Sequence, residues 1–507
     1  MKKTLTMCIT TDVHGTLQTR SYADGSDKTQ GLSRYLSAVT ELRKKQEVLI
    51  LDNGDILQGS PLLTYFQKKK RTPHLMAQAL NLIGVDYFNL GNHDFNYGKD
   101  ILNTFLNTLN APCLTSNITQ NAIPFGHSVI HTTKQGLRLG LIGVTTDYIP
   151  HWEKPSFIEG MTFLDPIAVV KNELLHLRPL VDFVIVLYHG GFERDLVTGL
   201  PSEPLTGENV GYALTQIEGI DLLITGHQHR SIIATVNHVP VTQCAFNAQE
   251  FAQVELSVTD QIKTIQTKLV KMGDFPEDQA MLTLIKPWED LTQNWLDQTV
   301  GQLSGHDYLI KDPFDARLHK HPLVSLLNTI QMEVSGAQLS GVSLFNDPTG
   351  FKPTVTYRDL VSTYVYPNTL VVKQINGTQL KAYLEKCADY FVIKDGEIKV
   401  NPEYDAPKSQ HFNYDMVDGI RYTLKISQPH GHRVINLTYR SKPIQNTDVF
   451  SLVINNYRAN GGGNFDMIVA CPTLSEVNID MTELLATYFE THPNLIPSHI
   501  NNIQVIL

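Results

Sequence analysis

Five short fragments of the sequence contain residue types that bind metal ions. They are Asp12-Val13-His14, Gly54-Asp55, Gly91-Asn92-His93-Asp94, His189-Gly190-Gly191 and Gly226-His227-Gln228-His229. Carboxylate, amide and imidazole groups suit hard or borderline divalent cations, and no fragment contains a cysteine. In an extended loop alternate residues point to the same side, so Asp12 and His14 can both reach one ion. The same spacing separates His227 from His229, and Asp55 is the natural carboxylate to bridge two ions.

Each fragment follows an apolar segment that the residue pattern predicts to be a buried strand. Strands are expected over residues 4–11, 47–52, 87–90, 137–145, 182–187 and 221–225. Helices are expected between them, over residues 31–45, 61–83, 99–109 and 168–177. This alternation predicts a layered α/β domain. Because loops at the carboxyl ends of strands in an open sheet face one crevice, the five fragments can converge there.

The length of 507 residues exceeds what one compact core holds, so the sequence predicts two domains. The first domain spans residues 1–273. Residues 274–305 connect the domains, with an exposed acidic helix that Pro287 should bend or interrupt and that Trp288 and Trp295 pack against a domain. The second domain spans residues 306–507, with strands at 369–375, 420–426 and 450–454 and helices at 323–335, 377–390 and 481–491.

Composition excludes several classes of partner. Lys and Arg total 41 against 51 Asp and Glu, a net charge of −10, which argues against nucleic acid or anionic membrane as a bulk partner. The five cysteines are scattered without a CxxC pair, so no disulfide framework is expected. Met1-Lys2-Lys3 resembles the start of a signal peptide, but the apolar stretch after it is short and runs into Asp12. We therefore expect a cytoplasmic protein without a membrane-spanning helix, monomeric or weakly oligomeric.

In this order, the five fragments resemble the signature of the calcineurin-like metallophosphoesterases. The rest of the chain is similar to the 5′-nucleotidase and 2′,3′-cyclic-nucleotide 2′-phosphodiesterase family. The similarity continues through Tyr366-Pro367-Asn368-Thr369-Leu370, Phe412-Asn413-Tyr414-Asp415 and Asn455-Asn456-Tyr457-Arg458-Ala459-Asn460-Gly461-Gly462. The resemblance therefore covers nearly the whole chain. It implies an N-terminal four-layer αββα metallophosphoesterase domain and a C-terminal α/β nucleotide-binding domain.

Carried over residue by residue, the resemblance implies two divalent metal ions. One would be held by Asp12, His14, Asp55 and His229, and the other by Asp55, Asn92, His189 and His227. Manganese, zinc, iron and cobalt all accept these ligands. Such a pair clamps the attacking and departing oxygens of a phosphoryl displacement and activates water. His93 matches the family histidine beside the phosphate, which stabilises developing charge or protonates the leaving oxygen, and Asn92 is expected to contact the substrate beside it.

One position departs from the nucleotidase pattern. Family members that act on 5′-monophosphates often place an aspartate three residues after this histidine, and here that residue is Asn96. An asparagine accepts a hydrogen bond but cannot stabilise an imidazolium through charge. The form Gly-Asn-His-Asp-Phe-Asn is closer to the cyclic-phosphodiesterase branch.

The resemblance assigns the nucleoside to the second domain. Phe412 and Tyr457 match two aromatic rings that sandwich the base, and the three glycines 461–463 would let the backbone approach the ligand. The nucleotidase branch also grips phosphate with a Gly-Gly-x-Arg element, whereas residues 344–350 of this chain contain no arginine. Arg458 or Lys352 could substitute.

These features predict a dinuclear-metal hydrolase of nucleotide phosphate esters, namely 2′,3′-cyclic nucleotides or 3′- or 5′-monophosphates. The partner is then a small-molecule nucleotide. One alternative is a UDP-sugar hydrolase with 5′-nucleotidase activity as the main function. Two others are a phosphodiesterase for non-nucleotide esters and a non-catalytic nucleotide-binding scaffold.

Overall fold

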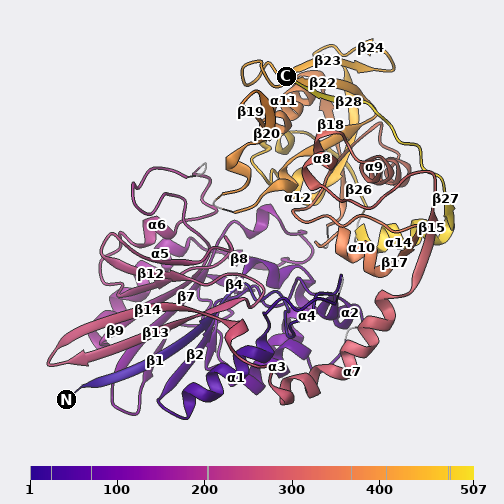
Figure 1. Cartoon of the computed structure of the whole chain (residues 1–507). Helices are drawn as coiled ribbons and strands as arrows, with labels where there is room; N and C mark the ends of the chain where they lie inside the picture. Colours follow the sequence, from indigo (N-terminus) through magenta and orange to yellow (C-terminus); the bar gives the residue numbers. More distant parts are fainter. Residues whose placement is uncertain are drawn as a thin grey trace. The chain divides into compact units, whose positions relative to one another are not determined.

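The computed structural model describes residues 2–507 except Asp24, Lys70, Glu203, Pro204, Pro367, Pro407, Asn478 and Asp480. Pro367 of the motif at residues 366–370 thus lies outside the described residues. The chain forms two compact units, Met1–Thr292 and Gln293–Leu507 (Figure 1). All five cysteines are free. Among the described residues, no helix has both the length and the apolar character needed to cross a bilayer.

The division between the units falls inside helix α7 (Gln279–Leu296). This helix is shorter than the predicted connecting segment, and Pro287 lies within it without ending it. Trp288 packs edge to face on Phe66 of the first unit, with ring centroids 4.8 Å apart. Trp295 lies against Tyr357 of the second unit. The two tryptophans therefore anchor the middle and the C-terminal end of the helix in different units.

The first unit contains two large sheets. One has the strand order β14-β13-β1-β2-β3, and the other has the order β11-β12-β10-β9-β7-β6. The first consists of β1 (Lys3–Thr10), β2 (Val48–Asp52), β3 (Tyr87–Phe88), β13 (Glu250–Thr259) and β14 (Ile262–Lys271). The second consists of β6 (Val129–Thr132), β7 (Arg138–Thr145), β9 (Phe183–His189), β10 (Leu222–Ile224), β11 (Ile232–Val236) and β12 (Val239–Gln243). A small sheet adds β4 (Ile118–Gln120), β5 (Ile123–Pro124) and β8 (Met161–Phe163).

Helices cover the outer faces of both sheets. They are α1 (Leu32–Arg43), α2 (Pro61–Lys68), α3 (Leu75–Ile83), α4 (Gly98–Thr108), α5 (Pro166–Leu177) and α6 (Gly211–Leu214). Short 3₁₀ turns are η1 (Asn92–Phe95), η2 (Ile149–His151), η3 (Arg178–Leu180) and η4 (Met272–Asp274). The segment 61–83, predicted to be helical throughout, is two helices, because Pro73 disfavours helical backbone at the residue before it.

Alternation along the strands explains the layers. In β1, Met7 and Ile9 face the core between the sheets, whereas Cys8 faces the core under α1 and α3. In β9, Ile185 faces the core between the sheets, whereas Val186 faces the core under α5. Each inner strand is therefore apolar on both faces, as a four-layer arrangement requires. The αββα fold is confirmed.

The second unit is also α/β, around one large hydrophobic core. Its main sheet has the order β21-β16-β25-β18-β26, formed by β16 (Leu339–Ser343), β18 (Leu370–Asn376), β21 (Asp415–Asp418), β25 (Val449–Asn455) and β26 (Thr473–Val477). Smaller sheets contain β15 (Thr299–Leu303), β17 (Thr354–Thr356), β19 (Phe391–Lys394), β20 (Glu397–Val400), β22 (Arg421–Lys425), β23 (Val434–Tyr439), β24 (Lys442–Pro443), β27 (Asn494–Leu495) and β28 (Ile503–Ile506). The helices are α8 (Pro313–Leu318), α9 (Pro322–Ser335), α10 (Tyr357–Thr363), α11 (Gly377–Ala388), α12 (Asn456–Ala459), α13 (Asp466–Val469) and α14 (Met481–Thr491), with 3₁₀ turns η5 (Pro402–Tyr404) and η6 (His411–Asn413).

Candidate functional site

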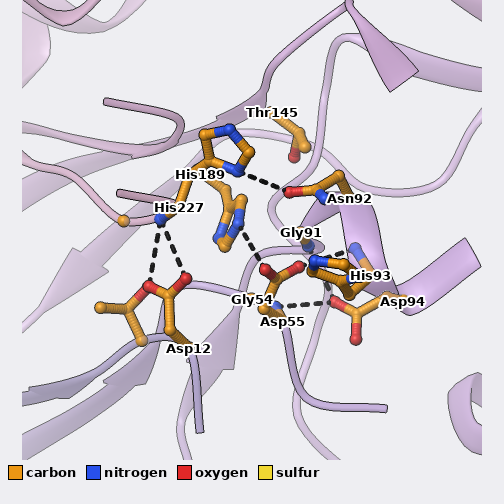
Figure 2. A network of polar contacts seen from close by, with 12 residues as sticks. Asp12, Gly54, Asp55, Gly91, Asn92, His93, Asp94, Thr145, His189 and His227 are labelled. Carbon is orange, nitrogen blue, oxygen red and sulfur yellow. Dashed lines mark hydrogen bonds and ion pairs between the residues drawn. The ribbon is translucent and has the colours of Figure 1, made fainter. Parts of the chain in front are cut away.

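The predicted metal ligands all lie at the carboxyl ends of parallel strands. Strands β1, β2 and β3 run parallel in one sheet, and β7, β9 and β10 run parallel in the other. The turns that follow β1, β2, β3 and β10, together with the last residue of β9, carry the seven ligands Asp12, His14, Asp55, Asn92, His189, His227 and His229. Figure 2 shows these turns converging, with His189 directed at Asp55 and Asn92 facing His227.

Five of the seven ligands have left-handed backbone conformations. The φ angles of Asp12, His14, Asp55, His227 and His229 are 53°, 47°, 60°, 67° and 55°. Residues other than glycine rarely adopt this region, and such strain concentrates at functional sites. The turns are held by backbone hydrogen bonds, from Asp12 N–H to the Gly54 carbonyl and from His14 N–H to the Asp55 carbonyl, both 2.9 Å long. The residue pattern did not predict this conformation.

Asp12, His14 and His229 form the first group of candidate ligands, with one ligand atom from each within 4.8 Å of the others. His14 Nδ1 lies 2.9 Å from the carbonyl oxygen of Gln58, so Nδ1 carries the proton and Nε2 offers a lone pair. His14 Nε2 lies 3.0 Å from Nε2 of His229, which in turn is 3.5 Å from Asp12 Oδ1. This arrangement of nitrogen and oxygen donors fits a cation.

Asp55, His189 and His227 form the second group, within the same limit of 4.8 Å. His189 Nδ1 donates to the carbonyl of Asn53 at 2.6 Å, which directs Nε2 to Asp55 Oδ2 at 3.2 Å. Both of these facing atoms are buried and make no hydrogen bond to the described residues. Asp55 Oδ2 also lies 4.0 Å from His14 Nε2, so this carboxylate stands between the two groups, as expected of a bridging ligand.

Asn92 joins the second group through His227. Asn92 Oδ1 lies 2.9 Å from His227 Nδ1, while His227 Nε2 lies 2.9 Å from a carboxylate oxygen of Glu208. With the Nε2 proton donated to Glu208, Nδ1 and the amide oxygen are two acceptors facing each other. A cation between them satisfies both. All seven predicted ligands are thus brought together, and they fit two divalent ions.

The charges around Asp55 also favour a bound cation. Burial alone raises the pKa of this carboxyl, but the imidazoles of His189 and His93 hold it well below its usual range. Burial lowers the pKa of His189, yet the adjacent Asp55 carboxylate outweighs this and raises it to about 10. The buried carboxylate therefore requires positive charge beside it, which a divalent cation supplies.

His93 borders the first group from turn η1. Its ring packs edge to face on His14, with centroids 5.4 Å apart, and is half-buried. His93 Nδ1 lies 2.7 Å from Asn96 Oδ1, and the amide nitrogen of Asn96 donates to Glu153. Glu153 was not predicted from the sequence, because it is distant in the chain and belongs to no motif.

Asp94 is a second residue whose role the sequence did not reveal, although it ends one of the five fragments. It is buried and accepts backbone N–H groups from Gly91 and Asp55 on one oxygen, and from Ile56 and Leu57 on the other, at 2.8–3.1 Å. These bonds connect the Asp55 turn to turn η1. Asp94 therefore positions the bridging carboxylate relative to Asn92.

Gly54 and Gly91 allow these two turns to touch. Gly54 has a φ of +92°, and a Cβ atom there would overlap the backbone of Gly91. A Cβ atom at Gly91 would overlap the carboxylate of Asp55. Any larger residue at either position would therefore displace the bridging ligand.

In the second unit, Phe412 and Tyr457 lie together. Their ring centroids are 6.0 Å apart and the planes meet at 76°, so the rings pack edge to face rather than in parallel. Both are half-buried. A Cβ atom at Gly462 would overlap the Tyr457 ring, so only a glycine at this position leaves room for the ring. The structure brings the predicted base-binding pair together; holding a base between the rings requires one of them to rotate.

The structure does not support Arg458 as a phosphate ligand. Its guanidinium is buried and pairs with Asp415, from Nε to Oδ2 at 2.7 Å and from the second terminal nitrogen to Oδ1 at 3.2 Å. It also donates to the carbonyls of Phe412 and Gly462 and to Asn413 Oδ1. All of its N–H donors are thereby directed at protein acceptors. Lys352, the other residue considered for this role, is exposed.

Comparison with known proteins agrees with this geometry. Residues 5–231 match the family model described as "Calcineurin-like phosphoesterase", and residues 299–470 match "5′-nucleotidase, C-terminal domain". A crystal structure of a candidate 5′-nucleotidase from Staphylococcus aureus is 32% identical to the chain, with 100% of both chains covered and a TM-score of 0.92.

Two curated relatives are more distant in sequence. The 2′,3′-cyclic-nucleotide 2′-phosphodiesterase/3′-nucleotidase of Haemophilus influenzae is 26% identical, over 96% of this chain and 84% of that protein. The 5′-nucleotidase of Mus musculus is 23% identical, over 92% of this chain and 84% of that protein. The chain therefore belongs to the calcineurin-like phosphoesterases that carry a 5′-nucleotidase C-terminal domain, which are metal-dependent hydrolases of phosphate esters.

Proposed function

We propose that this enzyme hydrolyses phosphate esters of nucleotides and prefers 2′,3′-cyclic nucleotides, with 3′- and 5′-monophosphates as further substrates. The nucleotide class is supported by the names of the relatives from Haemophilus influenzae and Mus musculus. The cyclic preference is supported by Asn96, which stands where the 5′-nucleotidase pattern has an aspartate.

One observation carries the catalytic part of the proposal. Buried Asp55 Oδ2 makes no hydrogen bond to the described residues and lies 3.2 Å from His189 Nε2 of one group of donors and 4.0 Å from His14 Nε2 of the other. Bound divalent ions would activate a water molecule and stabilise the charge of the phosphoryl group in transfer. Asp12, His14 and His229 would hold one ion, and Asn92, His189 and His227 the other, with Asp55 shared.

The protein's own contribution to the proton transfer centres on His93. Asn96 Oδ1 accepts the hydrogen bond from Nδ1–H, so an imidazolium at His93 presents its Nε2 proton on the other side of the ring. That proton can stabilise a phosphoryl oxygen or pass to the leaving oxygen of the ester. In the second unit, the rings of Phe412 and Tyr457 would stack on the base, which allows any base to bind.

A substrate panel on metal-replete enzyme tests the proposal. The panel compares 2′,3′-cyclic, 3′- and 5′-adenosine phosphates with a UDP-sugar, each before and after exhaustive chelation and after re-addition of Mn²⁺, Zn²⁺, Fe²⁺ or Co²⁺. We expect the highest kcat/KM on the cyclic substrate, no turnover after chelation and recovery with metal. A higher kcat/KM on the 5′-monophosphate or the UDP-sugar would contradict the cyclic preference. Full turnover after chelation would contradict the metal site, and nucleotide binding without turnover would indicate a scaffold.

A further inference from the structure

A buried carboxyl group lies directly behind the asparagine that contacts His93. Glu153 follows turn η2 and is 8% exposed. Its side chain accepts a hydrogen bond from Asn96 Nδ2, and it belongs to neither group of candidate metal ligands. Burial raises the pKa of Glu153 to about 7. Burying a carboxyl group is unfavourable, so its presence here calls for a role.

Glu153 determines which way the amide of Asn96 points. The oxygen and the nitrogen of an asparagine amide are nearly equal in size, so shape alone does not select one orientation. Above about pH 7, where Glu153 is mostly ionised, its carboxylate has only acceptors, and therefore only the Nδ2 end of Asn96 can face it. This leaves Oδ1 to face His93 Nδ1, the arrangement that the structure shows at 2.7 Å.

The orientation of this amide decides where His93 can carry protons. With Oδ1 facing the ring, Nδ1 is the nitrogen that donates, and Nε2 is the nitrogen left for the substrate. With the amide reversed, Nδ2–H would face Nδ1, which must then be an unprotonated acceptor. An imidazolium would be excluded in that state, because two donors would face each other.

We propose that Glu153 is a positioning residue for His93: by holding the Asn96 amide in one orientation, it keeps the proton on His93 Nδ1 and reserves Nε2 for the substrate phosphate. This inference rests on the proposed function and deepens it. An aspartate at position 96 would present acceptors on both oxygens and would need no partner to orient it. Glu153 therefore supplies what the asparagine lacks.

The first test is the variant Glu153→Leu, assayed on 2′,3′-cyclic AMP with full metal loading. The amide is then free to reverse, and only one orientation supports the acid. An equal division halves kcat, and a fourfold excess of the reversed amide lowers it fivefold, so we expect a fall of about two- to fivefold while KM stays within about twofold. The matched control is Glu385→Leu in the second unit. Glu385 is also 8% exposed and accepts two backbone N–H groups, from Arg433 and Val434. This control should lower stability and leave kcat unchanged.

The second test asks for rescue. Adding Asn96→Asp to Glu153→Leu places a carboxylate beside His93 whose two oxygens both accept, so no orienting partner is needed. We expect kcat to rise above that of Glu153→Leu and to reach the wild-type value. If Glu153 only filled space, the double variant would be no faster than Glu153→Leu, and that result would overturn the inference.

A third measurement does not depend on turnover. Ring-nitrogen NMR is recorded on histidine-labelled, zinc-loaded enzyme, and the His93 signal is assigned by its absence in His93→Gln. The wild type should show a protonated Nδ1 at His93, and Glu153→Leu should show a mixture of rings protonated at Nδ1 and rings unprotonated there. If that variant does not fold, Glu153→Gln keeps the volume and can accept or donate, so it should also give a mixed state. An unchanged His93 spectrum would refute the role of Glu153. Absence of nucleotide turnover by the wild type would instead refute the proposed function.

Discussion

Replacing Arg458 by lysine separates two roles for this residue, phosphate ligand or structural ion pair. In the structure its guanidinium makes hydrogen bonds to both oxygens of Asp415, to Asn413 Oδ1 and to the carbonyls of Phe412 and Gly462. A lysine keeps the positive charge but has one nitrogen with three donors, so at least two of these contacts are lost.

The size of the effect follows from the lost contacts. Each hydrogen bond of a charged donor contributes about 1.5–3 kcal/mol, so the loss of two lowers the free energy of unfolding by about 3–6 kcal/mol. Because the same guanidinium holds the backbone at Phe412 and Gly462, the aromatic pair should also loosen. The KM for nucleotides should therefore rise, whereas the KM for p-nitrophenyl phosphate, which carries no base, should not.

Denaturant unfolding and steady-state kinetics on both substrates measure these effects. The matched control is Arg358→Lys in the same unit, where the partner Asp297 has a side chain that is 67% exposed and the pair stabilises by less than about 1 kcal/mol. If Arg458→Lys unfolded like the wild type and raised the KM of both substrates equally, Arg458 would be the phosphate ligand, and the structural interpretation would be wrong.

Three further predictions concern other parts of the molecule. Burial between Phe66 and Phe105 lowers the pKa of His74 to about 4, against about 6.5 when unfolded. Between pH 6.5 and pH 4 the free energy of unfolding of the wild type should therefore fall by about 3 kcal/mol, and that of His74→Leu should not. Denaturant titration at several pH values measures this difference. Tyr457→Ala should raise the KM for nucleotides about 5- to 150-fold through the loss of one stacking ring, with p-nitrophenyl phosphate unaffected in the same assay. Asp55→Asn should lower the metal content below two ions per chain by elemental analysis, because the shared carboxylate charge is removed.

The sequence predicted the convergence of the metal ligands because that convergence depends on general rules. Short apolar runs identified β1, β2 and β9, and parallel strands necessarily place their carboxyl ends at one edge. Any donor residue just beyond those ends, such as Asp12 or His189, therefore reaches the same crevice. This inference needs the strand assignments but no side-chain detail.

The contacts that orient the ligands could not be predicted in the same way. Glu153 meets Asn96 across 57 positions of the chain, and nothing in its local sequence distinguishes it from a surface glutamate. Arg458 lies in the segment 455–462 that resembles the nucleotidase family, yet its direction is decided by Asp415, which belongs to strand β21. Such pairings depend on how separate elements pack, which residue spacing does not encode.

The orienting contacts also hold the metal-binding turns in strained backbone conformations. Left-handed φ angles at residues such as Asp12 and Asp55 cost about 1–3 kcal/mol each and persist only where neighbouring contacts enforce them. Here the enforcing contacts are the backbone bonds between the two turns and the four N–H groups gathered by Asp94. These bonds involve none of the ligand atoms of Asp12, His14 and His229. The turns can therefore keep their shape without a bound cation. The binding energy of the ions is then available for affinity rather than for ordering the loops.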